Sequence, residues 1–177
     1  MPTRQKKYFT FLILILLFSV FFVSGCGYRL RGHQELREDL QKVAILSFAN
    51  KTFESRIEDD LFNALVEEFA RSKNLKVVAA KDADLLVNGT IRTVESYSIS
   101  YSPDDKTYEY RVVMTLDVEV TEARTKQVFW RRSAMQEVEE YKASLEPLTI
   151  DRRKQAALKR LCRVLAENIH DGLFTDF

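Results

Sequence analysis

The chain has 177 residues, of which 27 are Lys or Arg and 26 are Asp or Glu, so its formal charge is only +1. This balance argues against a nucleic-acid partner, because nucleic-acid binding usually requires a basic face. Only five glycines and three prolines are present, which argues against long low-complexity stretches.

The first 25 residues have the layout of a secretory signal peptide. Arg4, Lys6 and Lys7 form a basic start, and the apolar run 8–23 follows it. A basic segment followed by a short apolar one is typical of a signal peptide, which is removed from the mature protein. The alternative is an uncleaved transmembrane anchor, but the run of sixteen residues is shorter than the roughly 17–25 that span a bilayer.

The apolar run ends in Val23-Ser24-Gly25-Cys26, which resembles a bacterial lipobox: small residues precede a cysteine that receives diacylglycerol. We therefore expect Cys26 to be the first mature residue and to carry acyl chains that anchor the protein to a membrane. Loss of residues 1–25 leaves 24 basic and 26 acidic residues, a formal charge of −2. Gly27 stands where an aspartate would favour inner-membrane retention in enterobacteria, so we expect the periplasmic side of the outer membrane.

The mature chain is predicted to contain a lipidated tether over residues 26–40 and a single domain over residues 41–177. Residues 42–48 are a nearly continuous series of β-formers, which indicates a strand buried on both faces. From 55 to 72, apolar residues recur every four positions, as in an amphipathic helix. Ser55 and Glu58 have the spacing of a capping box at the start of this helix.

Alternation of apolar and polar residues predicts three strands after a short one over 75–78: residues 85–92, 110–120 and 127–136. Sequential strands that are joined by short loops indicate an antiparallel meander. In the third strand, one face is expected to carry Val128, Trp130 and Ala134.

Residues 151–173 form the second predicted amphipathic helix, with Gly172 as its C-terminal stop. Cys162 lies on its apolar face and is expected to be a buried small hydrophobe rather than a reactive thiol. Two such helices can cover one face of a single sheet. The sequence therefore predicts an α+β two-layer sandwich, with both helices on one face of a mostly antiparallel sheet of four to five strands.

The sequence contains no recognisable catalytic or metal site. Its two histidines, His33 and His170, have no partner at ligand spacing, and His170 is expected at the surface of the last helix. No phosphate-binding glycine loop or G-x-S-x-G motif is present. The acidic run 137–140 is expected to be solvated charge in a connecting segment. We therefore predict a protein that is not an enzyme and needs no cofactor or metal.

Tyrosines flank a predicted hairpin tip at residues 102–107, and the hairpin is expected to bring those of the two strands together. Cross-strand packing is one interpretation of this arrangement. The other is a contact surface for a partner, because tyrosine suits interfaces that are apolar on one side and wet on the other. The residues concerned are Tyr97, Ile99, Tyr101, Tyr108 and Tyr110, of which Tyr97, Tyr101 and Tyr108 are the partner-contact candidates.

A second candidate cluster is basic and runs from the hairpin tip to the last helix. Solvated surface charge is one explanation for it. The other is a phosphate-binding surface, because arginine pairs well with phosphate and a periplasmic lipoprotein lies beside phosphorylated lipids. The cluster contains Lys106, Arg111, Arg131, Arg132, Lys142, Arg152 and Arg153.

Cys26-Gly-Tyr-Arg-Leu-Arg-Gly32 resembles the mature start of the lipopolysaccharide-assembly lipoprotein family, LptE, in which a C-G-aromatic start and a nearby Leu-Arg are common. Residues 108–118 resemble the central strand of that family, and Val128-Phe-Trp130 its next strand. The resemblance implies an outer-membrane lipoprotein that sits inside a large β-barrel and plugs it. It also implies that the protein helps the barrel to assemble and binds lipopolysaccharide on its way to the cell surface.

In this family, lipid binds basic residues of the hairpin tip and of the loop before the last helix. The resemblance therefore implies Lys106 and Lys142 as lipopolysaccharide-binding candidates, with Arg111 as a third. An alternative comes from residues 43–50 and the acidic helix after them. This pattern also resembles lipoproteins that regulate peptidoglycan synthases and lipoproteins of curli-type secretion.

Overall fold

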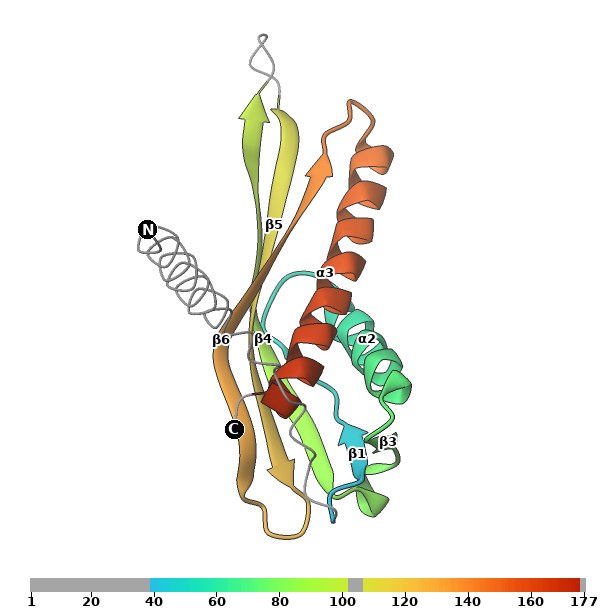
Figure 1. The fold of residues 1–177 in the computed structure, drawn as a ribbon. Helices are drawn as coiled ribbons and strands as arrows, with labels where there is room; N and C mark the ends of the chain where they lie inside the picture. Colours follow the sequence, from blue (N-terminus) through green and yellow to red (C-terminus); the bar gives the residue numbers. More distant parts are fainter. Residues whose placement is uncertain (1–38, 102–106, 176–177) are drawn as a thin grey trace, which may run out of the picture. The chain divides into compact units, whose positions relative to one another are not determined.

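The computed structural model describes residues 39–101 and 107–175, so Cys26, residues 26–38 of the expected tether and Lys106 lie outside the described residues. Leu40, placed at the end of the tether, is 2% exposed and belongs to the core. No helix in this part of the chain is long and apolar enough to cross a membrane. The elements in chain order are β1 (Lys42–Ile45), β2 (Ala49–Asn50), α2 (Ile57–Arg71), β3 (Lys76–Val77), the 3-10 turn η1 (Ala80–Asp82), β4 (Leu85–Tyr101), β5 (Thr107–Glu122), β6 (Val128–Lys142) and α3 (Pro147–Thr175) (Figure 1).

The described strands form one six-stranded mixed sheet in the order β3-β1-β4-β5-β6, and β2 also pairs with β4. β1 runs parallel to β3 and β4, whereas the pairs β4–β5 and β5–β6 are antiparallel. The predicted sheet was therefore too small and too uniformly antiparallel. Parallel strands require a crossover connection, and α2 supplies it by returning the chain to the edge of the sheet beside β1.

The core lies between one face of this sheet and the two helices α2 and α3, which lie on the same side of it in Figure 1. Along β5, the even-numbered side chains from Val112 to Val120 are almost fully buried, whereas the odd-numbered ones are only partly buried. This period of two is the signature of a strand with one covered face. The predicted α+β arrangement, with two helices on one face of a sheet, is confirmed, whereas the predicted number and direction of the strands are not.

Two β-bulges lie on either side of Asp117, at the middle of β5. On β4, Arg92 is the extra residue between two regular pairs, and on β6 two residues, Ser133 and Ala134, stand opposite Asp117. Ala134 has a φ of 51°, which is unusual for a residue with a side chain. Because the bulge shifts the alternation by one residue, Met135 is buried and Ala134 is exposed, so the face predicted for Ala134 was wrong.

The Asp117 carboxylate connects the two bulges. Its Oδ1 accepts a hydrogen bond of 2.8 Å from the backbone N–H of Ala134, and its Oδ2 lies 2.5 Å from Nε of Arg92. The bond from Ala134, followed by that from Arg92, lowers the pKa of Asp117 below its ordinary value. One ionised side chain therefore holds the irregular points of both neighbouring strands.

The start of α2 differs from the predicted capping box. The helix begins at Ile57 after Arg56, which has a φ of 63° and donates no side-chain cap. Glu58 is occupied elsewhere: its Oε2 accepts a 2.7 Å hydrogen bond from Nδ2 of Asn50. The side chain expected to cap the helix therefore fixes the loop before it.

α3 starts at Pro147 and continues past Gly172 to Thr175, so the predicted helix stop at Gly172 was wrong. Proline is well suited to the first turn of a helix, where its missing N–H is not needed. Gly172 is buried, and a Cβ at this position would lie 2.6 Å from Cζ2 of Trp130. The glycine therefore allows β6 to approach α3 closely.

Candidate lipid-binding and partner-contact sites

Of the predicted lipid-binding residues, the structure describes Lys142 and Arg111, which lie near the end of β6 and the start of β5. Lys142 is the last residue of β6, is exposed, and pairs in register with Glu109 near the start of β5. In Figure 1, the end of β6 and the start of α3 lie at the same end as the last residues of β4. Lys106 is outside the described residues, so its part in the candidate site stays a prediction.

Arg111 is positioned by β5 but its charge is engaged within the sheet. Its Nη2 lies 2.6 Å from Oε1 of Glu140 on β6, and it also hydrogen-bonds Tyr97. The hydrogen bond with Glu140 raises the pKa of Arg111 above its ordinary value. A cation that is already paired has less to gain from a lipid phosphate, so Arg111 is a weaker candidate than Lys142.

The acidic run 137–140 belongs to β6 and was wrongly placed in a connecting segment. Besides the Glu140–Arg111 pair, Glu137 accepts a 2.6 Å hydrogen bond from Asn168, and Glu139 lies 3.1 Å from Arg160. Asn168 and Arg160 both project from α3. These carboxylates therefore fasten the last helix to the sheet.

The tyrosines do not gather on one face as expected. Tyr97 pairs in register with Arg111, whereas Tyr110 pairs with Ser98 and stacks on Tyr141 at 5.3 Å between ring centroids. Adjacent residues of a strand point to opposite faces, so Tyr97 and Tyr110 are separated by the sheet. Tyr97 is 46% exposed and remains a partner-contact candidate. The side chains of Tyr101 and Tyr108 lie outside the described part of the structure.

Two exposed leucines, one in the β6–α3 connection and one in the first turn of α3, escaped the sequence-based prediction. Leu145 is 90% and Leu148 is 62% exposed. They lie on either side of Pro147 in the sequence. Neither belongs to the apolar stripe of the predicted helix 151–173, and only this feature of the sequence could have marked them as surface residues. Lys142 and Arg152, on either side of them in sequence, are also exposed.

Hydrogen bonds hold the connection that carries Leu145 in place. Nη1 of Arg153 donates to the carbonyl oxygens of Lys142, at 3.2 Å, and Ala143, at 2.5 Å. Within the connection, the N–H of Glu146 donates to Oγ of Ser144 at 3.2 Å. Arg153 was predicted as a phosphate-binding residue, but in the structure it holds the loop. Among the described residues, neither Lys142 nor Arg152 forms an ion pair.

This surface, the Leu145/Leu148 end, has the chemistry of a site for an anionic amphiphile. Exposed leucines gain free energy when an acyl chain covers them, and the ammonium of Lys142 and guanidinium of Arg152 can pair with phosphate. A second group of basic residues, Lys73 and Lys76, lies around an open cleft between α2 and β3. In Figure 1, β3 lies at the opposite end of the sheet from the end of β6.

The remaining chemical candidates are parts of the core. Cys162 is completely buried, as predicted, and burial raises the pKa of its thiol to about 12, with a smaller contribution from Asp60. A thiol with this pKa is not a nucleophile at neutral pH. Its place in the core agrees with a packing role.

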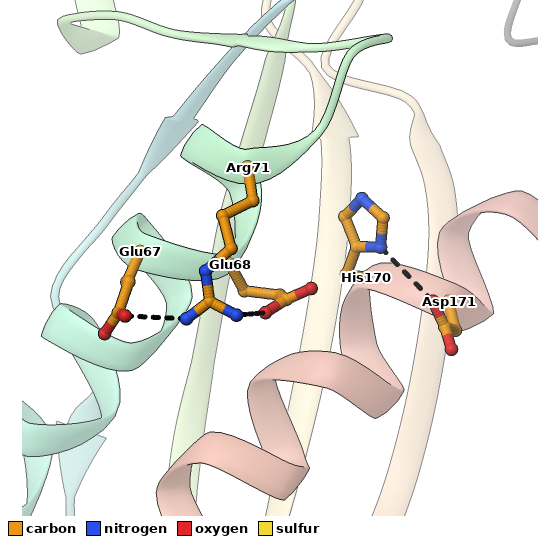
Figure 2. A network of polar contacts seen from close by, with 5 residues as sticks. All are labelled: Glu67, Glu68, Arg71, His170 and Asp171. Atoms are coloured by element: carbon orange, nitrogen blue, oxygen red, sulfur yellow. Dashed lines mark hydrogen bonds and ion pairs between the residues drawn. The ribbon is translucent and has the colours of Figure 1, made fainter.

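His170 is packed between the helices and is not the surface residue expected. Its side chain is only 16% exposed, and its ring contacts Phe69 of α2 and Phe174 of α3, with centroids 5.2 and 4.8 Å away. Nδ1 lies 3.3 Å from Oδ1 of Asp171 (Figure 2). Aromatic contacts on both sides explain why this polar ring is placed between two helices.

Figure 2 also shows Arg71 near the end of α2, where its guanidinium joins Glu67 at 2.6 Å and Glu68 at 3.1 Å. The hydrogen bond with Glu67 raises the pKa of Arg71 above its ordinary value. Arg71 and Glu67 are more than half exposed, and exposed ion pairs within a helix contribute little stability. The network is therefore surface charge rather than a binding site.

Comparison with known proteins assigns this architecture to a family. The LptE family model, described as lipopolysaccharide-assembly, matches residues 40–173. No curated protein sequence matches the chain.

Solved structures share the fold at low sequence identity. Rare lipoprotein B from Shewanella oneidensis is 18% identical, with a TM-score of 0.51 over 75% of this chain and 93% of that one. A hypothetical protein from Chlamydia trachomatis is 10% identical, with a TM-score of 0.53 over 78% of this chain and 99% of that one. At these identities the comparisons establish a common fold only.

Proposed function

Because the chain belongs to the LptE family of lipopolysaccharide-assembly lipoproteins of the outer membrane, we propose that it occupies and plugs a β-barrel translocon. It aids the assembly of that barrel and binds lipopolysaccharide during delivery to the cell surface. Acyl chains on Cys26 hold it on the periplasmic side, and residues 26–40 link them to the domain 41–177. None of these tasks requires a catalytic group, so the protein acts by binding.

The observation that carries the lipid-binding part is the Leu145/Leu148 end of the domain. Two leucines that are 90% and 62% exposed stand beside exposed Lys142 and Arg152. Lipopolysaccharide combines acyl chains with phosphate groups, and this surface offers a complement to both. Full burial of one leucine is worth about 1.5–3 kcal/mol, so the two together can contribute as much as the ionic contacts.

Charge reversal tests the ionic half of the site. Lys106→Glu with Lys142→Glu should weaken lipopolysaccharide binding, and the loss should shrink as the salt concentration rises because salt screens exposed charges. The matched control is Lys73→Glu with Lys76→Glu, which changes the net charge equally at the opposite end of the sheet. Equal losses in both double variants would remove Lys106 and Lys142 as the site.

The apolar half of the site is tested by a variant whose effect should not depend on the salt concentration. Leu145→Ser with Leu148→Ser should weaken lipopolysaccharide binding by an amount that salt does not alter, because the lost contribution is hydrophobic. Both leucines are exposed, so the thermal stability of the free protein should not change. Wild-type binding by this variant would show that the leucines do not contact the acyl chains.

Co-purification from detergent-solubilised outer membrane tests the partner. The acylated chain should recover a large β-barrel protein. Recovery of a peptidoglycan synthase without a barrel would instead support the alternative, a regulator of cell-wall synthesis. Incorporation of a labelled fatty acid into wild-type protein, and its loss in Cys26→Ser, tests the anchor independently of either partner.

A further inference from the structure

The loop between β2 and α2 presents an aromatic side chain that the core does not use. Phe53 is 107% exposed, which means that its surface is as accessible as in an extended peptide. Isolated apolar residues on a protein surface are common, so exposure alone decides nothing. A second observation is that hydrogen bonds and an ion pair hold the loop around Phe53 in place.

Asn50 fixes the two neighbours of Phe53. Its Oδ1 accepts hydrogen bonds from the N–H and the hydroxyl of Thr52, at 2.9 and 2.8 Å. Its Nδ2 donates to the carbonyl oxygen of Glu54 at 2.9 Å and to Glu58 at 2.7 Å. The residues before and after Phe53 are therefore attached to the same amide group, which is in turn attached to the first turn of α2.

The loop is also fastened to β4 and α3. The N–H of Lys51 donates to the carbonyl oxygen of Ile91 at 3.0 Å. The carboxylate of Glu54 forms an ion pair with Lys154 of α3, and these two side chains are only 20% and 27% exposed. Phe53 thus projects from a loop that three separate elements hold in place.

We propose that Phe53 is an anchor that inserts into an apolar pocket of a protein partner. On the premise of the proposed function, this partner is the outer-membrane barrel. An aromatic residue on a fixed loop loses little backbone entropy on binding, and aromatic anchors dominate the energy of protein interfaces. A lipid surface adapts to any apolar group, so it would not require the bracing by Asn50.

The surroundings of Phe53 define the rim of that pocket. Lys51 is exposed, and the Arg56 side chain is 85% exposed. Arg56 is partly neutralised by Asp59 at 3.2 Å, whereas Lys51 remains a surface cation. The charges around Phe53 have both signs, because Glu58, Asp59 and Asp60 lie in the first turn of α2, after Arg56. The partner therefore presents an apolar hollow with a rim of mixed charge. The interior of a large barrel is mostly polar, so one such hollow would fix the position of the inserted domain.

The test compares Phe53→Ser with wild type in the full-length acylated chain, co-expressed with the barrel. The variant should reduce barrel recovery by about tenfold or more, the usual range for a truncated anchor. Its melting temperature and its lipopolysaccharide binding should equal those of wild type. Asn50→Ala, which keeps the ring but releases the loop, should reduce recovery by a smaller factor, and Ser55→Ala is the matched loop control.

A photoreactive phenylalanine at position 53 gives an independent readout. It should cross-link to the barrel, whereas the same probe at position 73, just beyond the other end of α2, serves as the control. Equal barrel recovery by wild type and Phe53→Ser, or cross-linking only to lipid, would overturn the anchor and leave the proposed function intact. If wild type itself recovers no barrel, the proposed function and this inference both fail.

Discussion

Replacing Gly172 with alanine would add one methyl group to α3 at the point where the helix crosses Trp130 of β6. The new Cβ would lie 2.6 Å from Cζ2 and 3.3 Å from Cη2 of the indole ring. Non-bonded carbon atoms pack at about 3.5–4.0 Å, so the ring or the helix must move by about 1 Å. Trp130 is only 6% exposed, which leaves the ring little room to move.

Two opposing contributions set the size of the effect. Overpacking of a core costs about 1–3 kcal/mol, whereas alanine is favoured over glycine inside a helix by about 1 kcal/mol. Because the clash is severe and the site is buried, we expect Gly172→Ala to lower the free energy of unfolding by about 1–2 kcal/mol. For a domain of this size, the melting temperature should fall by about 3–6 °C.

Thermal unfolding followed by circular dichroism measures this difference. A double-mutant cycle with Trp130→Phe isolates its cause, because phenylalanine lacks the indole atoms that the methyl group would meet. Gly172→Ala should cost clearly less in the Trp130→Phe background. An increase in melting temperature in the wild-type background would refute the reasoning, because it would show that helix propensity outweighs the contact with Trp130.

Three further predictions follow from individual residues. Ala134→Gly should raise the free energy of unfolding by about 0.5–1 kcal/mol in urea titrations, because glycine accepts the positive φ at lower cost; Ala156→Gly on the exposed face of α3 should lower it. Cys162 should react with maleimide at pH 8 only after unfolding, since burial raises the pKa of its thiol to about 12; rapid labelling of the folded protein would contradict its place in the core. Asp117→Asn should be less stable than wild type at pH 7. Because the pKa of Asp117 is lowered on folding, that difference should disappear as the pH falls below about 4, whereas a constant difference would exclude its ionised form as the cause.

The periodic segments were predictable because a covered face imposes a period on the sequence. Residues Ile57, Leu61, Leu65 and Phe69 recur every four positions, and all four are buried on α2. The alternation along 110–120 likewise identified the covered face of β5. These patterns need no knowledge of neighbouring elements, because each helix or strand buries its own apolar side.

Pairing across the sheet was not predictable from such patterns. The run 42–48 reads as one strand, but β1 ends at Ile45 and β2 begins at Ala49, with Phe48 packed against Gly89 between them. The contact of Arg111 with Glu140 depends on the β5–β6 register, which the bulge of β6 determines. Sequence spacing alone cannot reveal which cation forms an ion pair with a carboxylate on another strand.

The candidate site residues also differ in how far the sequence could identify them. Cys26 and Lys106 were chosen from motif and resemblance, and both lie outside the described residues. Leu145 was overlooked because a leucine in sequence is usually a core residue, and only its 90% exposure marks it as a surface group. Phe53 was overlooked for the same reason, since nothing in the sequence distinguishes an exposed aromatic residue from a buried one.

The paired bulges at Asp117 have a consequence for how the sequence can change. Each bulge inserts a residue into a strand beside β5, so odd and even residues exchange faces at this point in both β4 and β6. Ile91 and Val94 face the helices on β4, and Trp130 and Met135 do so on β6. Deleting Arg92 would leave Ile91 opposite Leu116 and Thr93 opposite Thr115, so Val94 would stay on the helix-facing side with regular alternation. A one-residue deletion at either bulge therefore keeps the rest of the strand in phase, whereas a deletion elsewhere in β4 or β6 would turn the side chains beyond it to the opposite face.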